Sequence, residues 1–229
     1  MRVSVIVVAA GSGQRLGASA PKAFVKLGGR TLLAHALGII ARFGLADEVV
    51  ITVPPGMEAA AREEADNVGL VIPIKIIAGG AERQDSVRIA LGFTSAAAEL
   101  IVIHDAARPF ATVGMFQSCL DGAASVGAAI VAIPLADTLK RVDHHQIKET
   151  VPRANLWQAQ TPQAFRRDLI IRAHEWAVQN QVVATDDADL VERSGGAVTV
   201  VIGSPLNLKI TTAEDLSLAE AIAASRSLR

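Results

Sequence analysis

The sequence predicts an α/β fold in which a mostly parallel sheet is covered by helices on both faces. Hydrophobic residues make up 51% of the 229 residues and aromatic residues only 3%, so the core must consist of Ala, Val, Ile and Leu, which suits buried parallel strands. Short apolar runs also alternate with helical patterns, as is typical of a three-layer arrangement. The length suffices for one large domain, and we expect residues 1–229 to form one.

Six apolar runs are expected to form strands. They are Val3–Ala9, Glu48–Val53, Ile72–Ile77, Leu100–His104, Ala128–Ile133 and Ala197–Ile202. Helical patterns cover Thr31–Phe43, Met57–Asn67, Asp85–Thr94, Val113–Ser125, Arg166–Gln179, Thr185–Arg193 and Thr212–Ser225. Ligands of such sheets bind at the carboxyl ends of the strands, so the loops after 3–9, 72–77 and 100–104 are candidate site loops.

The stretch Leu135–Pro162 interrupts the alternation. It is polar, rich in Asp, His, Lys and Arg, and has no helical periodicity, so we expect it to leave the body as a β-hairpin arm. A two-stranded hairpin is only marginally stable by itself. The arm should therefore pack against something, and a second subunit is one candidate.

Charge and cysteine content limit the classes of partner. A net charge of −1 and a pI near 6.5 give no overall basic field, so we expect neither nucleic acid nor a membrane surface as a partner. Cys119 is interpreted as a small buried hydrophobe, and a lone cysteine without zinc-ligand spacing favours a reducing cytoplasm. The run Val3–Ala10 could pass for a signal-peptide core, but no Ala-x-Ala cleavage site follows it, and we interpret it as the first strand.

The glycine-rich loop Gly11–Gly17 follows that strand. A dinucleotide-binding site fits it poorly, because the spacing is G-x-G-x-x-x-G and the second strand ends in Val-Pro-Pro without an acidic residue. A P-loop fits less well, because no Gly-Lys-Ser or Gly-Lys-Thr follows. What remains is a loop whose N–H groups can hold phosphates beside Arg15. Lys22 could fold back over the same phosphates or be a solvated surface lysine.

An ordered set of motifs runs along the chain. The motifs are Ala9–Arg15 with Pro21-Lys22, Gly79–Val87, His104–Pro109, Asp137–Lys140, Arg153, Leu156–Gln163, Thr185-Asp186 and Asn207–Thr211. In this order, and over essentially the whole chain, they resemble the 2-C-methyl-D-erythritol 4-phosphate cytidylyltransferase family. The resemblance implies a Rossmann-like nucleotidyltransferase fold with a projecting arm and a homodimer. It also implies Mg²⁺ as cofactor, and CMP transfer from CTP to methylerythritol phosphate with release of pyrophosphate.

The resemblance also assigns roles to individual residues. Arg15, Lys22 and Lys209 are implied to be the catalytic cations, and Asp105 a metal ligand near the acceptor. The nucleotide is implied to contact Ala10, Gly11, Gly13, Gly79, Gly80 and Ser86. The acceptor is implied to contact Asp105, Arg108, Thr138, Arg153, Thr161 and Thr185, with Arg153 supplied by the partner subunit. Ala81 stands where some relatives carry an aspartate, so a side-chain contact there would be lost.

Several alternatives remain open on the sequence alone. Asp105 could be a turn or N-cap residue, Arg108 could pair with Asp105, and Asp85 and Ser86 could simply start a helix. The function could instead be that of a ribitol-5-phosphate cytidylyltransferase, a non-catalytic nucleotide-binding protein or, less readily, an NAD-dependent oxidoreductase. Some relatives are fused to the cyclodiphosphate synthase of the same pathway, and the sequence leaves that open for this chain.

Overall fold

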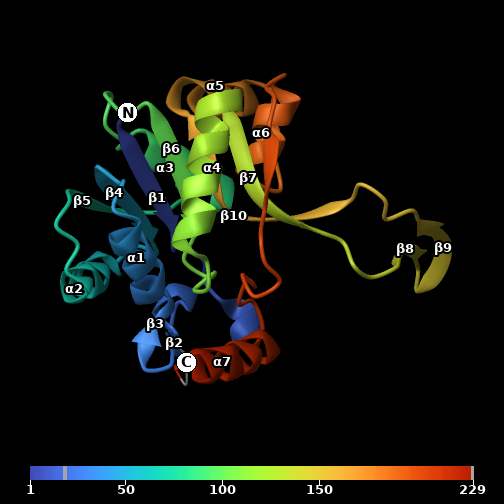
Figure 1. Cartoon of the computed structure of the whole chain (residues 1–229), viewed down its shortest axis with the longest axis horizontal. Coiled ribbons are helices and arrows are strands. Elements are labelled where there is room, and N and C mark those ends of the chain that lie inside the picture. The colour runs from blue at the N-terminus through green and yellow to red at the C-terminus, as the bar shows by residue number, and fades with distance from the viewer. Residues whose placement is uncertain (18–19, 228–229) are drawn as a thin grey trace.

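In the computed structural model, which describes residues 1–17 and 20–227, the chain forms a seven-stranded sheet (Figure 1). Its strands, in spatial order, are β11 (Thr199–Ile202), β7 (Ala128–Pro134), β10 (Trp157–Arg166), β6 (Leu100–Asp105), β1 (Val3–Val8), β4 (Glu48–Val53) and β5 (Ile74–Ala78). Only β10, among these described strands, runs antiparallel to its neighbours. The predicted mostly parallel sheet is confirmed.

Helices cover both faces of the sheet. One face packs against α1 (Leu32–Phe43), α2 (Glu58–Val68) and α4 (Val113–Val126). The other packs against α3 (Arg83–Leu91), α5 (Arg167–Gln179) and α6 (Asp187–Arg193). The alternation within β1 explains the division, because Val3, Val5 and Val7 face the first layer while Ile6 faces the second. The three-layer prediction is confirmed.

A smaller cap lies beyond the carboxyl end of β1. It consists of η1 (Gln14–Leu16), η2 (Lys22–Phe24), β2 (Lys26–Leu27), β3 (Arg30–Thr31) and the last helix, α7 (Ala213–Ser227). The buried side chains of Leu27, Leu32 and Ile210 hold it together, and α7 packs on β2 (Figure 1). This cap brings residues near both chain ends to one side of the sheet. No helix within the described ranges combines the length and apolarity needed to cross a bilayer.

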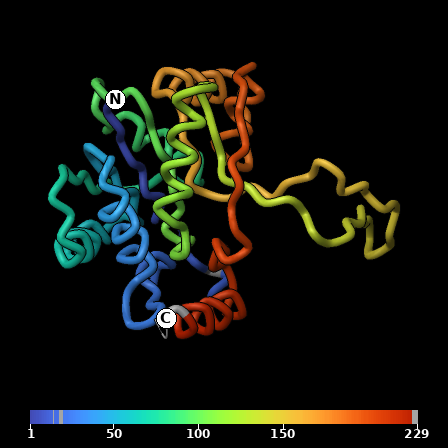
Figure 2. Tube along the Cα trace, in the orientation of Figure 1, coloured from blue at the N-terminus to red at the C-terminus, as the bar shows by residue number. Residues whose placement is uncertain are grey.

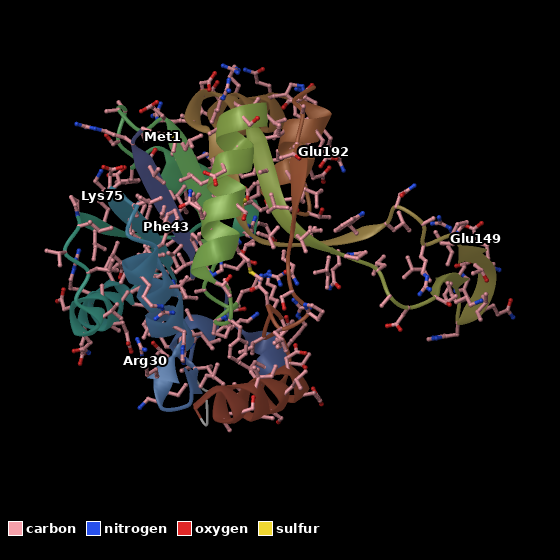
Figure 3. All side chains as sticks on the ribbon, in the orientation of Figure 1. Met1, Arg30, Phe43, Lys75, Glu149 and Glu192 are labelled. Carbon is pink, nitrogen blue, oxygen red and sulfur yellow. The ribbon has the colours of Figure 1, made fainter. Side chains whose placement is uncertain are left out.

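The hairpin of β8 (Leu139–Asp143) and β9 (Gln146–Val151) forms the arm, which extends away from the body (Figure 2). Figure 3 shows Glu149 near its far end, while Phe43 lies within the body. At the base of the arm, the N–H of Leu135 donates to the carbonyl of Leu156 at 3.0 Å.

The predicted end of the arm at Pro162 is wrong, because residues from Trp157 onward form β10 in the interior of the sheet. The strand has no long apolar run because it contains several polar residues, so its sequence does not predict a buried strand. Gln160 Nε2 donates to the carbonyl of Ser204 at 2.9 Å, and Gln163 Nε2 donates to Asp186 Oδ2 at 2.8 Å. Buried glutamines can lie in a central strand when their N–H groups find such acceptors, and these acceptors come from distant segments.

Candidate active site

A cavity of about 590 Å³ opens at the carboxyl ends of β1 and β6. After β1 the chain continues to β4 and β5 on one side, and β6 then pairs with β1 on the other side. Such a switch point leaves a crevice in which α/β sheets bind ligands. The cavity is lined by Val8, Ala9, Ala10, Gly11, Ser12, Gly13, Arg15, Lys22, Ala23, Gly80, Ala81, Glu82, Arg83, Ser86, Asp105, Ala106, Ala107, Lys209 and Thr211.

The loop after β1 is shaped by a close approach at Gly13. This residue has φ +71°, and a Cβ there would lie 2.9 Å from Cβ of Lys22. Both the left-handed backbone and the missing side chain therefore require glycine. The N–H of Leu16 donates to the carbonyl of Gly13 at 2.8 Å and closes the turn. As a result, η2 packs on the loop and Lys22 faces the cavity.

Lys22 lies in a strongly cationic environment. Burial lowers the pKa of Lys22 to about 8, and the charges of Lys209 and Arg15 add to the effect while Asp105 opposes it. Lys209, which follows β11 in the chain, places Nζ 2.7 Å from Oδ2 of Asp105. Cations held this close together are suited to a multiply charged anion, because the anion would relieve their repulsion.

A second wall of the cavity forms where the loop after β5 meets the start of α3. A Cβ on Gly79 would lie 2.3 Å from Cβ of Ala10, and one on Gly80 would lie 2.3 Å from Cβ of Asp85. Ser86 Oγ accepts from the N–H of Gly80 at 3.1 Å. Gly79 is not among the described residues that line the cavity, but it packs against Ala10 and Ser86, which are. Gly80 and Ser86, both predicted to contact the nucleotide, thus lie together in this wall.

The start of α3 also carries Arg83, a site residue that the sequence analysis missed. Its Nε lies 3.0 Å from Oδ1 of Asp105, and its Nη1 lies 2.7 Å from Oδ2 of Asp187. Burial by itself would raise the pKa of Asp105, but Arg83 and Lys209 outweigh it and hold that pKa well below the usual range. Asp105 is therefore ionised at neutral pH, with one oxygen on each cation.

Arg108 and Thr161, predicted to contact the acceptor, are absent from the described lining of the cavity. The Arg108 guanidinium is buried and donates to the carbonyls of Asn207 at 2.7 Å and Ala159 at 3.3 Å. The Thr161 hydroxyl is buried against Asp105, accepting from its main-chain N–H at 3.1 Å. In this structure both side chains support the walls of the site rather than face its interior. The Arg108 guanidinium therefore binds main-chain carbonyls and does not form the ion pair with Asp105 that the sequence left open.

The His104 ring lies 3.0 Å from the Thr161 hydroxyl. Burial lowers the pKa of His104 to about 4, so the ring is neutral at pH 7. The Thr161 hydroxyl thus bridges the main-chain N–H of Asp105, from which it accepts, and Nδ1 of His104. His104 therefore has a structural role, which agrees with leaving it out of the predicted catalytic set.

The chain matches the model of the family described as 2-C-methyl-D-erythritol 4-phosphate cytidylyltransferase over residues 3–225. The chain belongs to this family. A protein of that name from Deinococcus radiodurans is 45% identical over 221 residues, covering 96% of this chain and 89% of the relative. One from Halalkalibacterium halodurans is 43% identical over 229 residues and covers 100% of both chains.

A solved structure of 2-C-methyl-D-erythritol 4-phosphate cytidylyltransferase from Thermus thermophilus also aligns along nearly the whole length. It is 38% identical, has a TM-score of 0.82, and the alignment covers 98% of this chain and 100% of that one. The nucleotidyltransferase fold expected from the sequence motifs is therefore confirmed.

Thr138, Arg153 and Thr185 are exposed and lie outside the described lining of the cavity. Thr138 and Arg153 flank the hairpin of the arm, and Thr185 precedes α6. The structure thus brings Arg15, Lys22, Lys209, Asp105, Gly80 and Ser86 together, but leaves these three predicted acceptor contacts apart from them within one subunit.

The cavity offers a magnesium ion one well-placed carboxylate, that of Asp105. Asp105 is a hard carboxylate ligand of the kind that Mg²⁺ binds, and Mg²⁺ commonly uses one or two carboxylates together with substrate phosphates. Within the described residues, no cluster of three or more His, Cys, Asp or Glu side chains could hold a metal. A metal ion here would therefore have to be bound jointly by Asp105 and phosphate oxygens.

Proposed function

We propose that this chain transfers CMP from CTP to 2-C-methyl-D-erythritol 4-phosphate, giving 4-diphosphocytidyl-2-C-methyl-D-erythritol and pyrophosphate in non-mevalonate isoprenoid biosynthesis. The observation that carries the proposal is the pairing of Lys22 and Lys209 across the loop after β1, in a chain that belongs to the cytidylyltransferase family. The compartment is proposed to be the cytoplasm, on the ground of the lone buried Cys119.

The reaction joins two anions. A phosphate oxygen of the acceptor attacks the α-phosphorus of CTP, and the bond from that phosphorus to the β-phosphate oxygen breaks, so that pyrophosphate leaves with the electron pair. Positioning and positive charge supply most of the catalysis in such transfers. Lys22 and Lys209 would hold the α-phosphate and Arg15 would add charge nearby. A phosphate dianion is already nucleophilic, so no general base is needed.

The base is proposed to lie against the wall formed by Ala10, Gly79, Gly80 and Ser86. A larger side chain at Gly79 would collide with Ala10, so glycine lets these segments pack closely and leaves main-chain groups to read the edge of a cytosine. The Ser86 hydroxyl would contribute a hydrogen bond, and it already bonds the Gly80 N–H.

Mg²⁺ is proposed to bind with the nucleotide, held by Asp105 and phosphate oxygens. A bound Mg²⁺ would neutralise phosphate charge and polarise phosphoryl oxygens. For Asp105 to take that part, Lys209 must move its Nζ from Asp105 to a phosphate. Equilibrium binding of Mn²⁺, a spectroscopic substitute, should thus be weak to the protein alone and stronger with CTP; binding of equal strength without CTP would refute the joint site.

The acceptor phosphate is proposed to bind Thr138 and Arg153 from the arm of a partner subunit in a homodimer, near Thr161 and Thr185 of the receiving subunit. Support comes from the arm, which leaves Val142 and Ile147 53% and 64% exposed, a cost that a partner would remove. Mixing inactive Lys22→Ala and Arg153→Ala chains tests the sharing. Recovered activity supports it, and no recovery at any ratio counts against it.

Pyrophosphate release is the test of the reaction itself. Methylerythritol phosphate with CTP should be strongly preferred over ribitol 5-phosphate with CTP, and CTP over other nucleoside triphosphates. A preference for ribitol 5-phosphate would overturn the proposed acceptor. Tight CTP binding without any pyrophosphate release would instead indicate a nucleotide-binding protein that has lost turnover.

A further inference from the structure

A buried row of charged and polar side chains extends from the cavity toward α5. Asp105, at the end of β6, contacts Arg83 on α3. Arg83 also contacts Asp187, the first residue of α6, and Asp187 Oδ1 lies 3.2 Å from Nε2 of His174 on α5. The side chains of Asp187 and His174 are only 1% and 3% exposed. Side chains from three helices thus form one chain of contacts that ends at the Asp105 carboxylate.

Hydrogen bonding identifies the role of His174. The carboxylate of Asp187 has only acceptor oxygens, so the His174 Nε2 atom, 3.2 Å from Oδ1 of Asp187, donates to it. The Nδ1 atom of His174 is buried and, within the described residues, has no hydrogen-bond partner. His174 therefore fixes one oxygen of Asp187, while the other oxygen accepts from Arg83.

Arg83 depends on these contacts for its orientation. Its Nε donates to Asp105 and its Nη1 to Asp187, whereas its buried Nη2 has no partner in the described part of the chain. A planar guanidinium held at two points has a fixed plane. Without Asp187 only the contact to Asp105 would remain, and the guanidinium could rotate about it.

We propose that His174 and Asp187 are positioning residues that act through Arg83 on Asp105. The inference rests on the transfer reaction proposed above, in which Asp105 must present one oxygen to the ligands of the cavity. His174 orients Asp187, Asp187 orients Arg83, and Arg83 holds Oδ1 of Asp105 so that Oδ2 faces Lys209. None of this requires His174 or Asp187 to touch a substrate.

Charge and geometry predict opposite effects for Asp187→Asn. The substitution removes one negative charge near the cations of the cavity, and by charge alone it would tighten binding of a triphosphate. A positioning role predicts instead a lower kcat with little gain in affinity. His174→Leu removes the donor to Asp187, and His174→Gln keeps an N–H donor on a side chain of similar reach.

The test compares these variants with Ile170→Val, which trims another fully buried side chain of α5 that packs in the same core layer and should cost about 0.5–1.5 kcal/mol of stability. We expect His174→Leu and Asp187→Asn to lower kcat by about 10- to 100-fold, with the KM for CTP within about threefold of the parent chain. His174→Gln should recover much of kcat, and Ile170→Val should keep it.

A second readout needs no turnover. The Nε–H of Arg83 should give an NMR signal protected from solvent exchange in the unliganded chain, and His174→Leu should abolish that protection while Ile170→Val preserves it. Loss of protection and of kcat together supports the proposal. Parental kcat or preserved protection in His174→Leu overturns it, and if that variant does not fold, Asp187→Asn is judged by the same criteria. A parent chain without turnover refutes the proposed function, while the Arg83 signal still decides the positioning.

Discussion

The lowered pKa of Lys22 makes the pH dependence of nucleotide capture predictable. Only protonated Lys22 can attract the α-phosphate, and its pKa in the free protein is about 8 because of burial and the nearby charges of Lys209 and Arg15. A group with that pKa is about 90% protonated at pH 7 and about 10% at pH 9. The value of kcat/KM for CTP should therefore fall about tenfold between pH 7 and pH 9.

Other groups cannot account for this decline. Phosphate monoesters lose their second proton near pH 6, well before the decline begins. Burial raises the pKa of the Cys119 thiol to about 12 and lowers that of His104 to about 4. Because kcat reports the nucleotide complex, in which the triphosphate stabilises the protonated amine, kcat itself should decline only at higher pH.

Lys22→Arg is the decisive variant. Arginine stays charged throughout the range, so the decline of kcat/KM between pH 7 and pH 9 should disappear even if the absolute rate is lower. Lys26→Arg, at an exposed lysine of β2, is the matched control and should keep the parental profile. Initial rates of pyrophosphate release over pH 6–10 at constant ionic strength provide the measurement. A parental profile that stays flat to pH 10, or a decline retained in Lys22→Arg, would refute the assignment.

Three further substitutions test other parts of the structure. Gly79→Ala would place a Cβ 2.3 Å from that of Ala10, and the overpacking cost of about 1–3 kcal/mol should raise the KM for CTP roughly 5- to 150-fold; an unchanged KM would contradict the proposed base site. Glu48→Gln removes a buried carboxylate whose pKa is lowered by its hydrogen bonds and should lower the urea unfolding free energy at pH 7 by about 1.5–3 kcal/mol. The ionised Glu48 carboxylate stabilises the fold, and this stabilisation is lost as the pH falls from about 4.5 through the lowered pKa of Glu48. The difference in unfolding free energy between the parent chain and Glu48→Gln should therefore shrink below about pH 4.5, and a difference that stays constant would contradict this role of Glu48. Thr161→Val should destabilise by about 1–3 kcal/mol by leaving the Asp105 N–H unpaired, and Thr161→Ser should restore it; equal unfolding midpoints for both variants would argue against that hydrogen bond.

The sequence predicts those helices and strands whose buried residues form a hydrophobic pattern within the element itself. The strand at Glu48–Val53 contains the buried apolar run Val49–Ile51, and the helix ending at Phe43 is apolar on the face that it buries, so the local pattern alone is sufficient. The strand Trp157–Arg166 is not of this kind. Gln160 and Gln163 are buried in it and donate to Ser204 and Asp186, and no local pattern records these partners.

The site divides in the same way. The glycine loop with Arg15 and Lys22 can be recognised because its residues are close in sequence and chemically distinctive. Arg83 cannot, because its partners Asp105 and Asp187 are 22 and 104 positions away and only the fold brings them together. Arg83 does lie within the motif Gly79–Val87, but only the glycines and Ser86 of that motif were assigned a role from the sequence.

The position of β10 has a structural consequence. The strand pairs with β6 on one side and β7 on the other, so the arm is rooted in the middle of the sheet and not at an edge. Trp157, where the arm returns, and Thr161, whose hydroxyl fixes the main chain of Asp105, belong to the same strand. The point where the arm re-enters the body and the hydroxyl that fixes the main chain of Asp105 therefore lie four positions apart on one strand, so whatever holds the base of the arm lies close along the chain to a support of the cavity.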